Sequence, residues 1–191
     1  NCYTTGVLKG SGAAGGIGGV LGGSGYIKNC YSSATVIDQI ANNTGKAGGI
    51  IGRVNGNASG SSIENCYTSG DINAIGGGNA GGIVGKVDGG KLVIKNCIAW
   101  NSMLVSTDKA KVGRIVGGTA NATYENCYAY DGMILKAGEA TFTVSDETSP
   151  SGSSFQGVAK SANELKNTVI NWDSSLWKEG GNGYPVFKWS K

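Results

Sequence analysis

Five cysteines recur at regular distances, and their type and spacing make them the first candidates for chemistry. Each follows an asparagine, at Asn1, Asn29, Asn65, Asn96 and Asn126, so the cysteines are 28, 36, 31 and 30 residues apart. The sequence has no histidine, and an odd number of evenly spaced cysteines does not match the paired spacing of zinc or iron–sulfur ligands. The pattern predicts a buried column of free thiols. One or two disulfide bridges, or a reactive thiol, are the alternatives.

The absence of histidine excludes several common kinds of catalysis. A Ser-His-Asp triad, a Cys-His pair and a histidine-ligated zinc ion all need an imidazole group. Of the acidic residues, Asp71, Asp88, Asp108 and Asp131 fall in different repeats, mostly beside turns. We interpret them as turn residues and not as a general acid–base pair. We therefore expect no catalytic residue, no cofactor-binding residue and no metal ligand.

The residue that follows each cysteine forms a second column. It is Tyr3, Tyr31, Tyr67 and Tyr128 in four copies, and Ile98 in the other. If the cysteines point inward, we expect these side chains to point outward. Two interpretations stay open: an aromatic ladder that shields its own sheet, or an exposed strip that binds sugar rings or peptide.

The charge pattern bears on the kinds of partner. The formal net charge is +3, and only Arg53 and Arg114 are arginines. Nucleic-acid-binding domains usually cluster their basic residues and use arginine, so we expect no nucleic-acid partner. No apolar run is long enough to cross a membrane. The chain starts at Asn1 without a methionine or a signal-peptide pattern, and we expect a processed or excised piece of a longer chain with more coils or another domain upstream.

These residues belong to an internal repeat. A glycine-flanked apolar pair lies between consecutive cysteines, at residues 18–22, 48–52 and 81–85, with a degraded copy at 113–117. Short Ile/Val runs between Gly, Asn and Ser clusters predict strands and turns, and no repeat contains an Ala/Leu-rich helix. The pattern predicts a right-handed parallel β-helix of about five coils. The handedness rests only on the general bias of parallel crossovers.

Side-chain alternation refines this expectation at the cysteine strand. Strict alternation in Ile27-Lys28-Asn29-Cys30 would place the cysteine beside exposed charges, which is unusual for so buried a residue type. We infer that each asparagine occupies a corner, with positive φ, and turns the cysteine inward. The preceding charges then alternate between neighbouring coils, as Lys28, Glu64, Lys95 and Glu125, and each is expected to face its opposite.

The glycine motifs carry a similar expectation. The glycines permit tight turns, and stacked turns leave no room for side chains. Alternation places two apolar columns on opposite sides, namely Leu21, Ile51, Val84 and Val116 against Ile50, Ile83 and Ile115. One column should then face outward, either under a loop or as an interaction strip.

The repeat fades after Tyr128. Residues 161–166 predict one short helix with Ser161 and Glu164 as a capping box, and an aromatic cluster follows, made of Trp172, Trp177, Tyr184, Phe187 and Trp189. We expect this cluster to cover the open end of the solenoid, with a carbohydrate-stacking site as the alternative. Residues 1–135 would form the coils, and residues 136–191 the last coil and cap of the same domain.

The alternation of Gly-Gly-Ile-Val-Gly units with Ile-x-Asn-Cys-Tyr units resembles the GLUG repeat. The best matching copies are residues 81–87 and 63–72, and the ending 177–189 also resembles the close of such arrays. Arg114, in place of the second glycine, and Ile98, in place of tyrosine, depart from the pattern and suggest local distortion around the fourth coil. The GLUG repeat occurs in bacterial extracellular proteins, including adhesin-like proteins and the N-terminal part of IgA-specific metallopeptidases.

The resemblance implies an extracellular or bacterial cell-surface location and a non-enzymatic role. The expected function is an adhesin or scaffold segment that binds polysaccharide or a host surface or matrix protein, or that presents a neighbouring domain. One alternative is a carbohydrate-active β-helix enzyme, which would need convergent carboxylates. The other is a spacer within a large surface protease.

Overall fold

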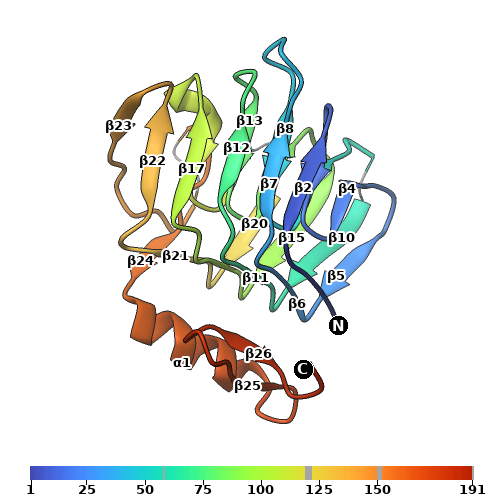
Figure 1. Cartoon of the computed structure of the whole chain (residues 1–191). Coiled ribbons are helices and arrows are strands. Elements are labelled where there is room, and N and C mark those ends of the chain that lie inside the picture. The colour runs from blue at the N-terminus through green and yellow to red at the C-terminus, as the bar shows by residue number, and fades with distance from the viewer. Residues whose placement is uncertain (58, 119–121, 150–151, 191) are drawn as a thin grey trace.

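The chain folds into stacked coils of short strands, each coil lying directly on the one before it (Figure 1). The computed structural model describes residues 1–57, 59–118, 122–149 and 152–190. Five parallel sheets run along the stack, and each coil contributes one strand to each of them in turn. Four such coils and a partial fifth confirm the predicted parallel β-solenoid of about five turns.

The sheet that carries the tyrosine column is called the tyrosine sheet. Its order is β1 (Cys2–Thr4), β6 (Cys30–Ser32), β11 (Tyr67–Thr68), β16 (Ile98–Ala99), β21 (Tyr128–Tyr130) and β24 (Val158–Lys160). The next sheet is β2 (Val7–Gly10), β7 (Thr35–Asp38), β12 (Ile72–Ala74), β17 (Met103–Ser106), β22 (Ile134–Ala137) and the antiparallel β23 (Ala140–Phe142).

The remaining three sheets of the stack have four strands each. The first is β3 (Ala14–Gly15), β8 (Lys46–Gly48), β13 (Asn79–Gly81) and β18 (Val112–Gly113). The second is β4 (Gly18–Leu21), β9 (Ile51–Val54), β14 (Val84–Val87) and β19 (Val116–Gly118). The third is β5 (Tyr26–Lys28), β10 (Ser59–Glu64), β15 (Lys91–Lys95) and β20 (Ala122–Glu125). A short 3₁₀ helix, η1 (Lys109–Lys111), precedes β18.

The asparagine corners are as predicted. Asn29, Asn65, Asn96 and Asn126 have φ values of 52°, 52°, 51° and 50°, a left-handed conformation that asparagine tolerates better than most residues. Their side chains form a ladder in which each amide nitrogen donates to the amide oxygen of the preceding coil, at 3.1–3.2 Å. Beside the ladder, Lys28 pairs with Glu64 at 3.5 Å and Lys95 with Glu125 at 2.8 Å.

From the second coil on, the glycine motifs bury both of their apolar columns, which corrects the expectation that one column faces outward. The predicted alignment of the first copy was also wrong, because Gly18 pairs with Ile51 and Leu21 pairs with Val54. Ile50 and Ile51 are 0% and 2% exposed, and the corresponding pairs in the next two coils are equally buried. The reason is a corner: β8 ends at Gly48 and β9 begins at Ile51. Strand alternation therefore does not apply between the two isoleucines, and both point into the core.

The stacked corners leave no room for a side chain, as expected. A Cβ atom at Gly49 would lie 2.2 Å from the carbonyl oxygen of Gly82, and one at Gly82 would lie 2.2 Å from that of Arg114. The repeat needs glycine here because the next coil lies directly against this backbone. These glycines do not have positive φ, so the close approach is the requirement rather than an unusual turn conformation.

Arg114 and Ile98 do not distort the fourth coil, contrary to the expectation. Tyr67, Ile98 and Tyr128 are consecutive partners in the tyrosine sheet, and Gly81 pairs with Gly113 in unbroken register. Arg114 takes the second glycine position in the last glycine motif, where no further motif stacks on it. Ser145, Asp146, Gln156 and Gly157 contact Arg114 instead, and its buried side chain donates to the carbonyl oxygens of Gln156 and Gly157.

The C-terminal segment lies along the side of the stack, which corrects the prediction that its aromatic residues cover the open end. It consists of helix α1 (Ala162–Trp172) and the hairpin of β25 (Trp177–Glu179) and β26 (Pro185–Phe187). Figure 1 shows this layer below the stack, with the C-terminus brought back near the N-terminus. The helix is longer than the predicted 161–166, and the Ser161 backbone N–H donates to the Glu164 carboxylate at 2.9 Å, as in the expected capping box.

The last coil is covered by other residues. Strand β23 folds back antiparallel on β22, and Phe155 bridges to Val116. Phe155 is 1% exposed and belongs to the interior apolar cluster that contains the cysteines. These residues cover β22 and Val116 at the open end of the stack, which is part of the role that the aromatic cluster was expected to have.

Candidate functional site

The tyrosine column is buried beneath the C-terminal segment. The rings of Tyr3, Tyr31 and Tyr67 stack with centroids 5.0 and 5.1 Å apart and planes within 9°. Tyr31 and Tyr67 are 5% and 1% exposed, because the rings of Trp177 and Phe187 pack onto them. The Trp177 ring centroid lies 6.0 Å from that of Tyr31 and 5.8 Å from that of Tyr67. The Phe187 ring centroid lies 5.2 Å from that of Tyr31 and 4.5 Å from that of Trp177. The column therefore points out of the solenoid, as predicted, but it is neither a free recognition strip nor a ladder that covers itself.

Burial also changes the chemistry of the tyrosine hydroxyl groups. Loss of solvent raises the pKa of Tyr67 well above its usual value, and Tyr31 and Tyr184 add to this effect. The Tyr67 hydroxyl donates to the backbone carbonyl oxygen of Pro185 in β26. The Tyr67 hydroxyl group therefore stays protonated at any physiological pH and acts as a structural donor.

The cysteines form the predicted inward column. All five are free thiols; Cys30, Cys66, Cys97 and Cys127 are buried, and Cys2 is exposed. The Cys97 thiol donates to the carbonyl oxygen of Ile63 at 3.4 Å, and the Cys127 thiol to that of Ile94 at 3.5 Å. Cys97 and Cys127 thus bond to the strand of the coil before them, whereas the Cys30 thiol donates to the carbonyl oxygen of Lys28, two residues earlier, at 3.3 Å.

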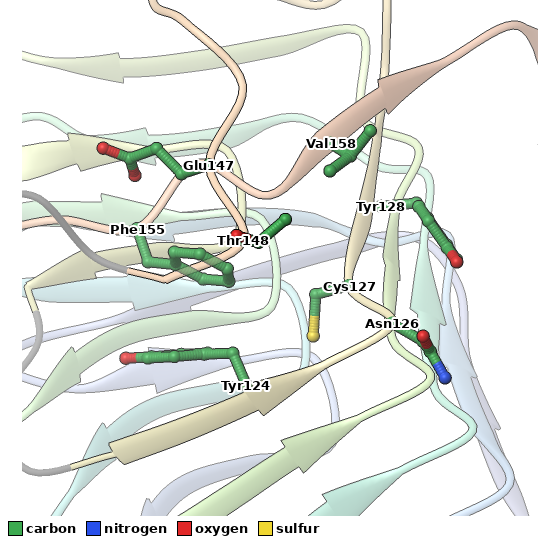
Figure 2. A pocket seen from close by; sticks show the side chains of 8 residues that line it. All are labelled: Tyr124, Asn126, Cys127, Tyr128, Glu147, Thr148, Phe155 and Val158. Carbon is green, nitrogen blue, oxygen red and sulfur yellow. The ribbon is translucent and has the colours of Figure 1, made fainter.

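A cavity of about 240 Å³ opens beside the last of these thiols. Figure 2 shows Cys127 pointing into it from one side, with Tyr124 and Phe155 on the other and Glu147 at the rim. The Tyr124 and Phe155 rings are 4.0 Å apart. Desolvation raises the pKa of Cys127 to about 12. The thiol is therefore protonated at neutral pH and unsuited to nucleophilic attack, which needs the thiolate.

The acidic residues of the turns remain apart. Asp71 accepts from the Met103 backbone N–H at 3.1 Å, and Asp108 from the Ala110 N–H at 2.9 Å, as turn residues do. Within the described ranges, no three His, Cys, Asp or Glu side chains lie close enough to hold a metal ion. No described helix is long and apolar enough to cross a membrane.

Two acidic residues have structural partners that the sequence did not indicate. Asp88 pairs with Arg53 and Lys86, and these hydrogen bonds outweigh its partial burial and lower its pKa. Asp38 is buried and accepts from three backbone N–H groups, those of Gly12, Ile40 and Lys46. Its place in a Val-Ile-Asp strand, flanked by apolar residues, is the one sequence feature that pointed to burial.

A second groove was missed entirely. It lies between the turn that follows β16 and the C-terminal segment, and its lining includes Trp100, Tyr130 and Tyr184. Trp100 is the one tryptophan outside the C-terminal cluster, which was the available sign that this turn differs from its neighbours. The groove joins residues from three separate elements, so no local pattern could reveal it.

Comparisons with known proteins give one informative match. No family model matches the chain, and no curated protein does. A solved structure, described as "a putative immunoglobulin A1 protease from Bacteroides ovatus", is 51% identical over the whole of this chain, with a TM-score of 0.91. The chain spans 57% of the length of that structure's chain. The two chains share the fold.

Proposed function

We propose that this chain is a non-catalytic β-solenoid module of a secreted or cell-surface protein, and that it serves as a rigid spacer that presents a neighbouring part of the protein. The observation that carries the proposal is the seating of β25 and β26 on the tyrosine column. This contact joins the last described residues to the first coil, since Trp189 lies 5.7 Å from Tyr3. A stack tied along its side in this way resists bending.

The similarity to the protein from Bacteroides ovatus supports a spacer within a surface protease. The proposed absence of catalysis by this module rests on chemistry: the Cys127 thiol beside the cavity is protonated, and the acidic turn residues bond to backbone groups in separate coils. Peptide hydrolysis needs an activated nucleophile or an activated water molecule. The carbohydrate-active alternative needs two facing carboxylates, and Asp71, Asp88 and Asp108 do not converge.

The spacer role is tested by measuring the distance between the two ends of the stack. Cys2 is the exposed thiol, so spin labels can be placed there and on Glu139→Cys, an exposed residue in the turn between β22 and β23. A narrow distance distribution is expected for a rigid spacer. A broad distribution, with the fold retained by circular dichroism, would contradict it.

The proposed lack of catalysis has its own test. The purified chain is incubated with immunoglobulin A1, and the heavy chain is followed by gel electrophoresis. We expect the heavy chain to stay intact. Cleavage that tracks with the chain through a second purification step would overturn the proposal.

Adhesion to polysaccharide or to a host protein is the second candidate function. The observation that favours it is the open groove beside Trp100 and Tyr184, since the tyrosine column itself is covered. Retention of the purified chain on immobilised polysaccharide or matrix protein would support adhesion. Loss of that retention in a groove variant would assign it to this surface.

A further inference from the structure

The groove beside the fourth coil is preformed, and its walls come from both layers of the molecule, the solenoid and the C-terminal segment. It has a volume of about 340 Å³, at the lower end of the range of roughly 300–1,000 Å³ typical of small-molecule sites. The solenoid contributes Trp100 and Tyr130, helix α1 contributes Asn163 and Lys166, and the turn between β25 and β26 contributes Asn182 and Tyr184.

The aromatic part of the groove is held in place by its own packing. Trp100 is 5% exposed, and its ring meets the ring of Tyr184 edge to face, with centroids 4.7 Å apart. The Tyr130 ring lies across Gly132, where an added Cβ atom would be 2.7–2.8 Å from the ring and hydroxyl. Both tyrosines are half-buried, so each keeps part of its surface toward the groove without needing to move.

The polar side chains that line the groove carry no unpaired charge. The Lys166 amino group bonds to the Glu179 carboxylate at 3.0 Å, which neutralises it. Asn163, in the first turn of α1, and Asn182 are exposed. The Asn163 amide offers both donors and an acceptor, and the Asn182 amide offers its two donors, since its oxygen accepts from the Tyr184 backbone N–H at 3.3 Å. Burial raises the pKa of Tyr184, with Tyr130 and Asp71 adding to the effect, so its hydroxyl group also remains a donor.

We propose that this groove binds a neutral saccharide of one or two sugar rings. A pyranose ring has an apolar C–H face, which packs on aromatic rings such as those of Tyr130 and Tyr184. Its edge carries hydroxyl groups that both donate and accept, and these match the amides of Asn163 and Asn182. An anionic sugar is disfavoured because the one basic side chain of the lining, Lys166, is already paired.

The test uses the whole chain and saturation-transfer difference NMR with glucose, galactose, mannose, N-acetylglucosamine and cellobiose as probes. Titration then gives the dissociation constant of each sugar that binds. We expect at least one neutral sugar to bind. Ser102→Trp, which places a bulky ring in the groove from an exposed position, should abolish binding, and Asn163→Ala should weaken it at least several-fold.

Matched controls separate the groove from the rest of the surface. Asn171→Ala changes another exposed asparagine of α1, and Ser33→Trp changes an exposed serine in the corresponding turn of an earlier coil; both should bind like the unmodified chain. Tyr184→Ala should lose binding, while Tyr26→Ala, which changes a tyrosine that is 79% exposed on another face, should not. The absence of binding by every neutral sugar, preference for an acidic sugar, or binding that survives Ser102→Trp would each overturn the proposal.

Discussion

The hydroxyl group of Tyr67 donates a hydrogen bond to the backbone carbonyl oxygen of Pro185, 118 residues further along the chain. Tyr67 is 1% exposed, and Pro185 is buried in β26. The bond fixes the hairpin on the third coil of the stack. It joins the solenoid to the C-terminal segment through a polar contact inside a largely apolar interface.

Tyr67→Phe should destabilise the protein by about 1–3 kcal/mol, because the Pro185 carbonyl group would be left buried without a donor. The ring stacking with Tyr31 would remain, so the change isolates the hydrogen bond. Urea denaturation followed by tryptophan fluorescence measures the effect. Tyr26→Phe, at a site 79% exposed, should leave the free energy of unfolding unchanged, and an equal loss in both variants would contradict this account.

Gly82→Ala should be severely destabilising, by more than about 3 kcal/mol, since overpacking against rigid backbone is costly. The added Cβ atom would lie 2.2 Å from the Arg114 carbonyl oxygen, and two coils would have to separate to admit it. Thermal unfolding is the measurement. Gly56→Ala is the matched control, because there the nearest atom would be 3.7 Å away; a similar melting temperature for both variants would show that the stack can relax.

Asn96→Ala should cost about 1 kcal/mol or more beyond Asn96→Gly, since a left-handed backbone is strained for alanine and not for glycine. Asn96 has φ 51° and bonds to both Asn65 and Asn126 in the ladder. Both variants lose these bonds, so their difference reports the backbone strain alone. Equal free energies of unfolding for the two variants would mean that this position requires asparagine for its side-chain hydrogen bonds and not for its left-handed backbone.

The thiols should differ sharply in reactivity with a thiol-specific dye. At pH 8 the native protein should react with about one equivalent, at the exposed Cys2, and the denatured protein with five. The four buried thiols are shielded from the reagent, and desolvation raises the pKa of Cys127 to about 12, so raising the pH toward 10 should not release it. Cys2→Ser should reduce the native signal to nearly zero. Rapid native reaction of two or more thiols would contradict the buried column.

The pairing of Arg114 with Asp146 should make stability depend on acid. The hydrogen bond from Arg114, at 2.8 Å, lowers the pKa of Asp146 in the folded protein. Stability from this pair is therefore present above the unfolded pKa of about 3.9 and is lost as the pH falls through the lower, folded value.

Asp146→Asn should accordingly lower the melting temperature at pH 7 and leave it unchanged near pH 2. The effect should be below about 1 kcal/mol because the carboxylate is half-exposed. Asp131→Asn, in which the Asp131 backbone N–H still bonds to Lys160, is the control. A difference from the unmodified chain that persists at pH 2 would assign the effect to packing.

The repeat made the solenoid predictable. Prediction failed at the corners between strands and where the C-terminal segment packs on the coils. The positive φ of Asn96 could be predicted because Cys97 was expected to be buried, and a left-handed corner at the asparagine turns that cysteine inward. Ile50 and Ile51 were misjudged because alternation was continued across a corner. The covering of Tyr31 by Phe187 could not be derived, because an aromatic segment near the end of the sequence fits the open end and the side of a stack equally well.

The candidate groove was out of reach for the same reason. Trp100 and Tyr184 come from different layers, and the edge-to-face contact between them exists only because the hairpin lies along the stack. Asp108 accepts from a nearby backbone group, as the sequence indicated for a turn residue, whereas Asp71 accepts from Met103 in the next coil. The candidate groove exists only where the solenoid and the C-terminal segment meet.

The position of β25 and β26 also has a consequence for biosynthesis. A ribosome releases the coils first, and the stacked faces of Tyr3, Tyr31 and Tyr67 have no cover until residues 177–189 emerge. During that interval the nascent chain displays a flat aromatic surface with unpaired strand edges nearby, which is the kind of surface that holdase chaperones recognise and that aggregates when it is crowded. Burial of the tyrosine column during synthesis therefore waits for the hairpin of β25 and β26 to be made.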